Sequence, residues 1–325
     1  MSTVQNTTLR PTYQQDWRSY NLAQTHEKEH VAALLRSLCE AIESPAQHRG
    51  RPRIPLADAV FSAAMKVYST TSGRRAMSDM RELERKGFID KAPSYNSIFN
   101  ALENPALTPI LKTMIEESAR PLREVETDFA VDSSGFATAS YVRWFDVKYG
   151  KAKTRCKWLK AHVMIGVKTN VVTSVEVTGG FESDSPRFGP LVRSTAQRFK
   201  ITKVSADKAY SAKRNLRTIS AAGAFPLVPF RDNATGLTPP FDALWKRMYD
   251  FYVYNRDEFM QHYHQRSNVE TTFSMIKAKF GAYVRSKTPT AQRNELLCKV
   301  LCHNLCVLVQ SLYELGIEPT FWAAA

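Results

Sequence analysis

Three acidic residues have positions that could bring carboxylates together. Asp132 directly follows the apolar run Phe129–Val131, and Asp207 follows the run Ile201–Ala206. A carboxylate just past an apolar strand projects from the carboxyl edge of a sheet, where α/β folds place their ligand sites. If the two strands are neighbours, Asp132 and Asp207 converge, and a cation between them would offset their repulsion. Mg²⁺ suits such a site, because it binds a few carboxylates together with substrate phosphates. Taken singly, each Asp is more typical of a turn or a cap.

The third carboxylate, Glu270, lies in a stretch with helical character. A phenol and two cations accompany it at helical spacing, in the order Tyr263, Arg266, Glu270 and Lys277. Offsets of 3, 7 and 14 residues from the phenol place all four on one stripe of a helix. The stripe offers one metal ligand between cations that can hold phosphate oxygens. The alternative is a solvated face held by ion pairs between residues four apart.

The segment Tyr263-x2-Arg266-x3-Glu270-x6-Lys277 resembles the Y-R-E-K motif of DDE-type insertion-sequence transposases, and the similarity continues along His262–Lys277. Asp132-Ser-Ser-Gly-Phe and Asp207-Lys-Ala-Tyr look like the first and second Asp blocks of that family. The two Asp blocks are weak alone and strong in this order. The resemblance covers about residues 55–315, and only 62 residues separate Asp207 from Glu270, so any insertion between them is small.

The resemblance implies an RNase-H-like catalytic domain that hydrolyses and transesterifies DNA with two divalent metal ions per active site, Mg²⁺ or alternatively Mn²⁺. Asp132 would bridge both ions, while Asp207 and Glu270 would each bind one. Arg266 and Lys277 would position phosphates, with Tyr263 hydrogen-bonding beside them. Water attacks first and frees a 3′-OH, and that 3′-OH then attacks target DNA.

The implied partners are double-stranded DNA, as the element's terminal inverted repeats and as target, and further copies of the chain. A homodimer or larger assembly on DNA is expected, in the cytoplasm with the nucleoid and without a membrane. Two other functions stay open from the sequence. One is an RNase-H-like structure-specific nuclease that cuts without joining, and the other is a captured transposase retained as a DNA-binding protein.

A basic, aromatic segment follows the first Asp block. Residues 141–160 hold one acidic residue, Asp146, and seven basic ones: Arg143, Lys148, Lys151, Lys153, Arg155, Lys157 and Lys160. Five aromatic residues are interleaved, among them Trp158. Basic side chains contact phosphates and aromatic rings stack on unpaired bases, so the segment is predicted to bind DNA. The alternative is an exposed pair of strands with packed aromatic residues.

Helices and strands must position these groups. Helical periodicity is expected over residues 22–43, 55–67, 74–86, 95–103 and 109–119, and again over 190–199, 212–221, 263–280 and 296–315. Strands are expected at residues 129–131, 161–167, 171–177, 201–206 and 225–228, with a turn at Thr169-Asn170 and an irregular stretch over 231–262. This order outlines a mixed α/β, RNase-H-like domain preceded by an all-helical module and closed by a C-terminal helix.

The expected domains are a loose arm over residues 1–20, a helical DNA-binding module over 21–122 and a catalytic domain over 123–325 with a small insertion at about 231–262. The helices at 74–86 and 95–103 could form a helix-turn-helix, although residues 87–93 make a longer connection than the usual turn of about 3–4 residues. A plain helical packing module is the alternative.

Composition excludes several classes of protein. The 325 residues are 43% hydrophobic, which is enough for a core, and no run of about 18 apolar residues or signal-like N-terminus is present. Five cysteines do not form a disulfide scaffold in so long a chain. The net charge of +14 suits a phosphate-rich partner. The zinc-like pattern His26-Glu-Lys-Glu-His30 is interpreted as a solvated helix, and Cys298, Cys302 and Cys306 as small core residues.

Overall fold

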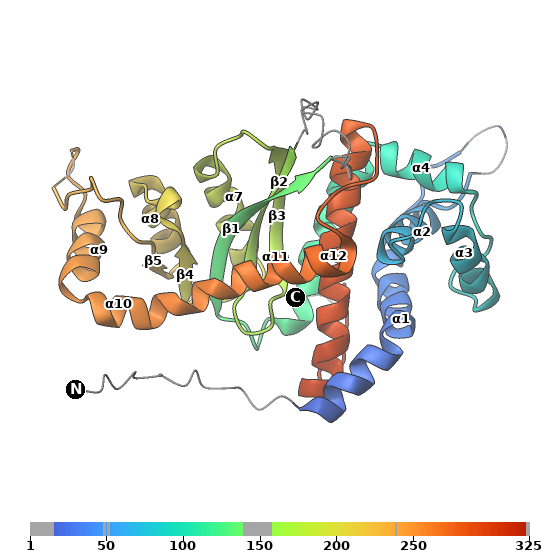
Figure 1. The fold of residues 1–325 in the computed structure, drawn as a ribbon, viewed down its shortest axis with the longest axis horizontal. Helices are drawn as coiled ribbons and strands as arrows, with labels where there is room; N and C mark the ends of the chain where they lie inside the picture. Colours follow the sequence, from blue (N-terminus) through green and yellow to red (C-terminus); the bar gives the residue numbers. More distant parts are fainter. Residues whose placement is uncertain (1–15, 48–49, 51–52, 139–157, 238, 323–325) are drawn as a thin grey trace, which may run out of the picture.

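A five-stranded mixed sheet lies at the centre of the molecule (Figure 1). The computed structural model describes residues 16–47, 50, 53–138, 158–237 and 239–322. The strands are β1 (Asp128–Ala137), β2 (Trp158–Gly166), β3 (Val172–Gly179), β4 (Lys203–Ala206) and β5 (Phe225–Leu227). In the order β3-β2-β1-β4-β5, the first three pair antiparallel, and β4 is parallel to both β1 and β5. The predicted mixed α/β fold class with a closing C-terminal helix is confirmed.

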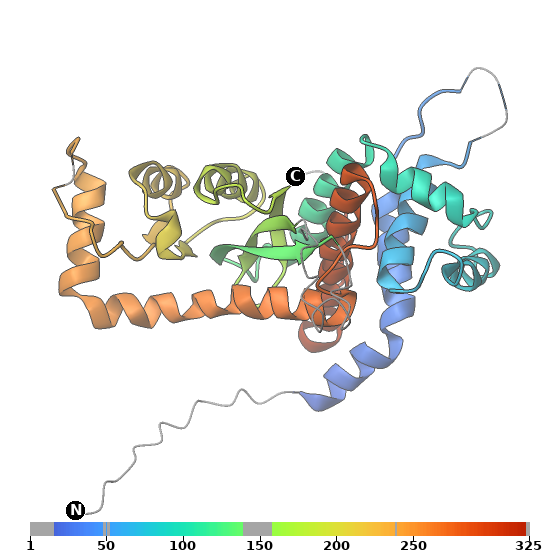
Figure 2. The ribbon, with the colours of Figure 1, turned by 45° about the horizontal axis from the view of Figure 1, so that its top comes forward.

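The central strand β1 alternates its side chains between two cores. Phe129 and Val131 belong to one buried cluster, whereas Ala130 belongs to the other, as the two-residue period of a strand requires. The first cluster includes side chains of α7 (Ser185–Ala196) and α8 (Lys213–Ala221), and the second includes side chains of α11 (Ser267–Phe280) and α12 (Pro289–Leu315). Figure 2 accordingly shows α7 and α8 on one side of the sheet and α11 on the other.

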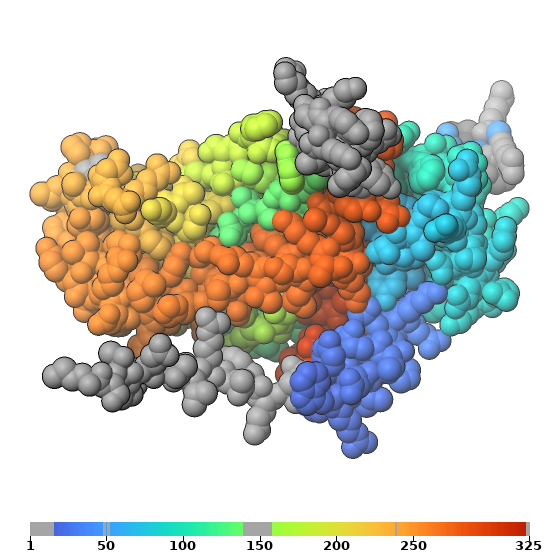
Figure 3. All heavy atoms as spheres, viewed as in Figure 1, coloured from blue at the N-terminus to red at the C-terminus, as the bar shows by residue number. Residues whose placement is uncertain are grey.

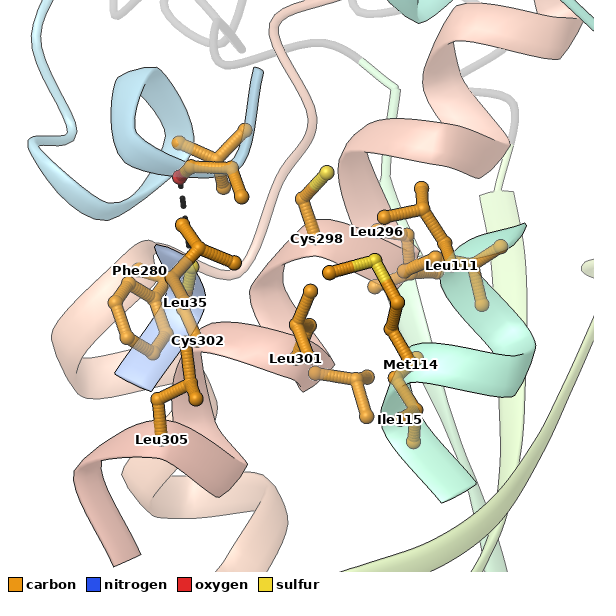
Figure 4. Packing of buried hydrophobic residues seen from close by; sticks show 14 of the residues in the cluster. Leu35, Leu111, Met114, Ile115, Phe280, Leu296, Cys298, Leu301, Cys302 and Leu305 are labelled. Atoms are coloured by element: carbon orange, nitrogen blue, oxygen red, sulfur yellow. Dashed lines mark hydrogen bonds between the residues drawn. The ribbon is translucent and has the colours of Figure 1, made fainter. Parts of the chain in front are cut away.

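The N-terminal helices pack around α12 and share its core. They are α1 (Trp17–Cys39), α2 (Leu56–Tyr68), α3 (Ala76–Arg85), α4 (Tyr95–Glu103) and α5 (Leu107–Ala119), followed by the short 3₁₀ turn η1 (Arg120–Leu122). Leu35, Met114 and Leu301 come from three different helices of this core (Figure 4). The predicted division near residue 122 therefore falls between segments that share a hydrophobic core, and it stays a prediction. Most of the predicted N-terminal arm falls outside the described residues.

Helix α12 is apolar because it runs through this core. Its length and composition would allow it to cross a membrane, but 78% of its most apolar window is buried inside the protein. Cys298 and Cys302 are buried there, and the Cys302 thiol donates a hydrogen bond to the Ala64 carbonyl (Figure 4). His30 of α1 also contacts α12, because its Nε2 lies 2.9 Å from the Tyr313 hydroxyl oxygen.

The segment 231–262 is not irregular, and that expectation is wrong. It contains α9 (Ala243–Tyr254) and most of α10 (Arg256–Tyr263). An Asp242 carboxylate oxygen caps α9 by accepting the N–H of Trp245 at 2.9 Å, and the Trp245 ring packs edge-on against Phe230 at 4.7 Å. Aromatic residues on several sides of these helices obscure the helical period in the sequence.

The helix predicted over residues 263–280 is also interrupted. Helix α10 ends at Tyr263, the 3₁₀ turn η3 (His264–Arg266) follows, and α11 begins at Ser267. The three elements nevertheless continue in one direction (Figure 2). In Figure 3 they form an orange ridge across one face of the molecule. The predicted stripe therefore runs along this ridge with a tighter turn at Arg266.

Candidate active site

The parallel pairing of β1 with β4 places Asp132 and Asp207 side by side. Val131 lies opposite Ala206, so the next residue on each chain is the carboxylate. The Asp132 side chain is 20% exposed, and one of its oxygens accepts the N–H of Ser133 at 2.8 Å. Burial, together with the charge of Asp207, raises the pKa of Asp132 above its ordinary value. The repulsion expected between two neighbouring carboxylates is thus present.

Asp207 is oriented by the turn that follows β4. Its Oδ1 accepts the N–H of Ala209 at 2.8 Å and caps the 3₁₀ turn η2 (Lys208–Tyr210). Asp207 therefore acts as a cap, as an Asp after a strand often does, and it also lies beside Asp132. The two interpretations of this residue are therefore compatible.

Arg266 joins β1 to α11. Its guanidinium donates to Asp132 Oδ2 at 3.1 Å and to Glu270 Oε1 at 2.8 Å. Partial burial acts to lower the pKa of Arg266, but Tyr263 and the carboxylates of Asp132, Glu270 and Asp207 outweigh it and raise the pKa. The Arg266 guanidinium therefore links the Glu270 side chain, which is 64% exposed, to Asp132 at the edge of the sheet.

Tyr263 completes this side of the site. Its ring stacks on Phe259 at 5.7 Å, and the Arg266 guanidinium carbon lies 5.7 Å from the ring centre. Burial raises the pKa of Tyr263 to about 12, and the charges of Asp207 and Asp132 act in the same direction. The phenol is therefore neutral at physiological pH and can donate a hydrogen bond.

Lys277 contacts β1 at a separate point. Its ammonium donates to the Ser134 hydroxyl at 2.7 Å and lies 5.2 Å from the Phe136 ring centre. Burial lowers the pKa of Lys277. Since alternate residues of a strand share one face, Asp132, Ser134 and Phe136 point the same way. The four stripe residues therefore fall into two groups. Tyr263, Arg266 and Glu270 lie near Asp132, whereas Lys277 lies further along the same face of β1.

Comparisons with known proteins identify the family of this chain. A model of the transposase DDE domain matches residues 123–305, which is more than half of the chain and includes Asp132, Asp207 and the Tyr263–Lys277 stripe. The chain belongs to this family. A probable transposase for insertion sequence element ISA1214 from Archaeoglobus fulgidus is 30% identical over 106 residues. Those residues are 33% of this chain, and the match spans only 31% of the archaeal protein.

A solved structure also aligns with this DDE transposase-family chain. It is a cryo-EM structure of a piggyBac transposase synaptic complex with hairpin DNA. The alignment covers 93% of this chain and 76% of the other, with a TM-score of 0.43 and 10% sequence identity.

DDE transposases generally depend on divalent metal ions, and the donors in this DDE domain fit such ions by type. Asp132, Asp207 and Glu270 supply only oxygen ligands, which hard cations prefer. Burial and, to a smaller extent, the charge of Asp207 raise the pKa of Asp132, and a cation bound there would offset both effects. Across the part of the chain that the structure describes, no group of three His, Cys, Asp or Glu side chains is gathered as a metal site. Arg266 instead supplies the positive charge between Asp132 and Glu270.

A second cluster of polar side chains in the DDE domain is centred on Asp184 and contacts Ser133 of β1. The sequence-based predictions did not include it. Asp184 accepts a hydrogen bond from the Ser133 hydroxyl at 3.1 Å and from the Lys160 ammonium at 2.9 Å. The imidazole of the buried His162 lies with Nδ1 3.4 Å from the same Asp184 oxygen. Ser133 in turn donates its backbone N–H to Asp132. Asp184 is therefore in a position to orient the Asp132 carboxylate through Ser133.

One signal for this cluster exists in the sequence. Lys160 and His162 are polar residues on one face of an otherwise apolar strand, and His162 pairs with Ser133 across the β1–β2 ladder. Burial lowers the pKa of His162, against the charge of Asp184. Polar residues at alternate positions of a buried strand need partners, so the sequence indicates a polar cluster on this face of β2 without identifying Asp184 as a member of it.

Most of the predicted DNA-binding segment of the DDE domain lies outside the described residues. This applies to Arg143, Lys148, Lys151, Lys153, Arg155 and Lys157. Trp158 is described, at the start of β2 and 46% exposed. A Cβ at Gly180 would lie 2.5 Å from the Trp158 Cβ, and one at Gly135 would lie 3.2 Å from its ring. Two glycines therefore leave room for this indole at the end of the sheet.

Proposed function

We propose that this chain is the transposase of an insertion sequence, which binds the element's ends and catalyses metal-dependent DNA cleavage and strand transfer. The observation that carries the proposal is the Asp132–Arg266–Glu270 bridge beside Asp207. Carboxylates for cations and a guanidinium for phosphate are the groups that phosphodiester chemistry needs. Membership of the transposase DDE domain family supports the proposal.

Asp132, Asp207 and Glu270 would hold two divalent ions, Mg²⁺ or Mn²⁺, as the resemblance implies. Bound there, the ions would supply the charge that activates the attacking oxygen and stabilises the leaving one. Ser133 and Asp184 would keep the Asp132 carboxylate in place for this role, through the backbone N–H of Ser133 and its hydroxyl.

The proposed reaction has two in-line displacements. In the first, a water oxygen attacks phosphorus at the element's end, the P–O3′ bond breaks, and the 3′ oxygen keeps the electron pair and takes up a proton. In the second, this 3′-OH gives up its proton and attacks a target phosphodiester, and a new P–O bond joins element to target. The target's P–O3′ bond breaks, and its 3′ oxygen keeps the electron pair and takes up a proton. Neither step needs a covalent bond to a side chain.

The stripe residues would act on the phosphates. Arg266 would exchange its carboxylate partners for phosphate oxygens once cations neutralise those carboxylates, since a guanidinium binds either group through paired hydrogen bonds. Lys277, held on Ser134, would place a second positive charge further along β1. Tyr263 would donate a hydrogen bond from its neutral phenol, as its raised pKa allows.

The partners in this proposal are double-stranded DNA, as terminal inverted repeats and as target, within the nucleoid of the cytoplasm. The helical segment 21–122 and the predicted DNA-binding segment 141–160 would bind it outside the reacting phosphates. Because transposition joins two element ends, a homodimer or larger complex is expected on DNA. The mass of the protein on paired end-DNA tests this, and a strict monomer active at both ends would contradict it.

The proposal is tested with two matched Asp variants of β1. Asp132→Asn should bind end-DNA nearly as well as the unaltered protein but should not cleave it. Asp128→Asn is the control, because Asp128 begins the same strand four residues before Asp132 and pairs with Lys203 at 3.7 Å. It should cleave normally. Cleavage that survives Asp132→Asn would refute the assigned site, and cleavage without any joined product would favour the nuclease alternative.

A further inference from the structure

Helix α3 contacts α1 through two of its acidic side chains and lines an open cleft with Arg81. Towards α1, Asp79 and Glu82 pair with Lys28 at 3.1 and 3.2 Å. On another face, an open cleft of about 740 Å³ lies between α3 and the start of α4. Three arginines, two polar residues and a methionine are among its lining residues: Arg74, Arg75, Arg81, Ser94, Tyr95 and Met77. Asp79 and Glu82 are thus already neutralised by Lys28 of α1.

The arginines of this cleft have no such compensation. All three are exposed, and among the residues that the structure describes no carboxylate forms an ion pair with Arg74, Arg75 or Arg81. Arg74 lies over the ring of Tyr95, with 5.3 Å between the guanidinium carbon and the ring centre. Three neighbouring cations repel one another, so the cleft is stabilised by a bound polyanion.

The geometry of the cleft suits a phosphate backbone better than base edges. Residues 86–94 separate α3 from α4, which is a longer connection than the turn of about 3–4 residues in a helix-turn-helix. Guanidinium groups bind phosphate oxygens through paired hydrogen bonds, and contacts of this kind position DNA without selecting its sequence. Helices α3 and α4 lie at the opposite end of the molecule from α9 (Figure 1).

We infer that Arg74, Arg75 and Arg81 form a binding site for the backbone of duplex DNA on the α3–α4 cleft, outside the catalytic centre. This inference rests on the proposed function, because it assigns to a named surface the part of the element's DNA that lies beyond the reacting phosphate. Binding there would hold a duplex against the helical segment while its end reaches β1 and α11.

The salt dependence of DNA binding by the full chain tests this inference. The probe is a labelled duplex of arbitrary sequence, with affinity measured by fluorescence anisotropy at several NaCl concentrations. Each phosphate contact contributes about 0.9 to the slope of log affinity against log salt. Arg75→Ala and Arg81→Ala should each reduce that slope by about this amount, and the double variant by about twice as much.

Two controls keep the result interpretable. Lys28→Ala removes a cation from the same helical segment, but one that is already paired with Asp79 and Glu82, so the slope should not change. Arg81→Lys keeps the charge and should keep most of the slope, even if the alanine variants fold poorly. An unchanged slope in the folded arginine variants would overturn the inference.

Failure of the inference and failure of the proposed function are distinguishable. If the slope depends on the arginines but no cleavage is found under any metal condition, the cleft assignment stands and the transposase proposal fails. If cleavage occurs and the arginine variants have the same salt slope as the unaltered protein, only the cleft assignment fails. Binding of inorganic phosphate that is lost in Arg81→Ala, with duplex binding unchanged, would show a small-anion site and would also overturn it.

Discussion

Removal of the Arg266 guanidinium should lower the free energy of unfolding of the metal-free protein. It should also increase the stabilisation that the protein gains from divalent cations. Arg266 and Asp132 are 17% and 20% exposed, so Arg266→Ala leaves a largely desolvated carboxylate beside Asp207 without its cation. Breaking a fully buried ion pair costs about 3–5 kcal/mol. Partial exposure here, and the 64% exposure of Glu270, reduce the expected loss to about 2 kcal/mol.

This loss can be measured as a thermal shift. For 325 residues at about 2.1 cal/mol/K per residue, 2 kcal/mol corresponds to about 3 °C in Tm. Saturating MgCl₂ should raise the Tm of Arg266→Ala more than that of the unaltered protein, because cations no longer compete with the guanidinium for Asp132 and Glu270. Differential scanning calorimetry with and without MgCl₂ gives both quantities.

A matched control separates this effect from general destabilisation. Arg198 pairs with Glu116 at 3.0 Å, and their side chains are 25% and 22% exposed, away from the candidate site. Arg198→Ala should lower the Tm without changing its response to MgCl₂. If MgCl₂ shifts Arg266→Ala, Arg198→Ala and the unaltered protein equally, Arg266 does not compete with cations and the reasoning is refuted.

Three further predictions concern residues around the site and in the core. Lys277→Ala should slow single-turnover cleavage by about 100-fold while affinity changes little, as expected for a charge directed at the reacting phosphate; a change in affinity alone would contradict this. Asp184→Asn should lower the bound-state cleavage rate and raise the Mg²⁺ concentration needed for half-maximal rate, because the Ser133 contact that orients Asp132 is weakened; an unchanged Mg²⁺ dependence would exclude that role. Burial lowers the pKa of His303 to about 4, outweighing its hydrogen bond to the Asn170 carbonyl, while Lys279 acts in the same direction as burial. The unfolded chain therefore binds more protons, and the free energy of unfolding should fall by up to about 3 kcal/mol as pH drops from about 6.5 to 4. His303→Gln should flatten this dependence in urea titrations, and an unchanged curve would assign it to other groups.

The positions of the two aspartates could be predicted from the sequence because the relevant pattern is local. Phe129–Val131 and Ile201–Ala206 are apolar runs that end at a carboxylate, and the parallel register of β1 and β4 does place Asp132 and Asp207 side by side. The helical stripe was predictable for the same reason. Its interruption at η3 was not, since a 3₁₀ turn keeps Tyr263, Arg266 and Glu270 close enough to preserve the pattern.

Contacts between distant segments could not be predicted in this way. Asp184 lies 51 residues from Ser133 in the chain, and their contact depends on how α7 packs on the sheet. The Arg266–Asp132 ion pair spans 134 residues and requires that η3 lies across β1. Helix α9 was missed because its aromatic residues, such as Trp245, pack against neighbours on several sides. Local spacing does not contain this information.

Strand transfer of a pre-cut end tests the central claim most directly. A labelled duplex that ends in a free 3′-OH at the element's terminus is incubated with the full-length protein, MgCl₂ and a supercoiled plasmid. The account predicts plasmid molecules covalently joined to the label, and none with Asp132→Asn although that variant still binds the duplex. Nicking of the plasmid without any joined label, or joining that persists in Asp132→Asn, would contradict it.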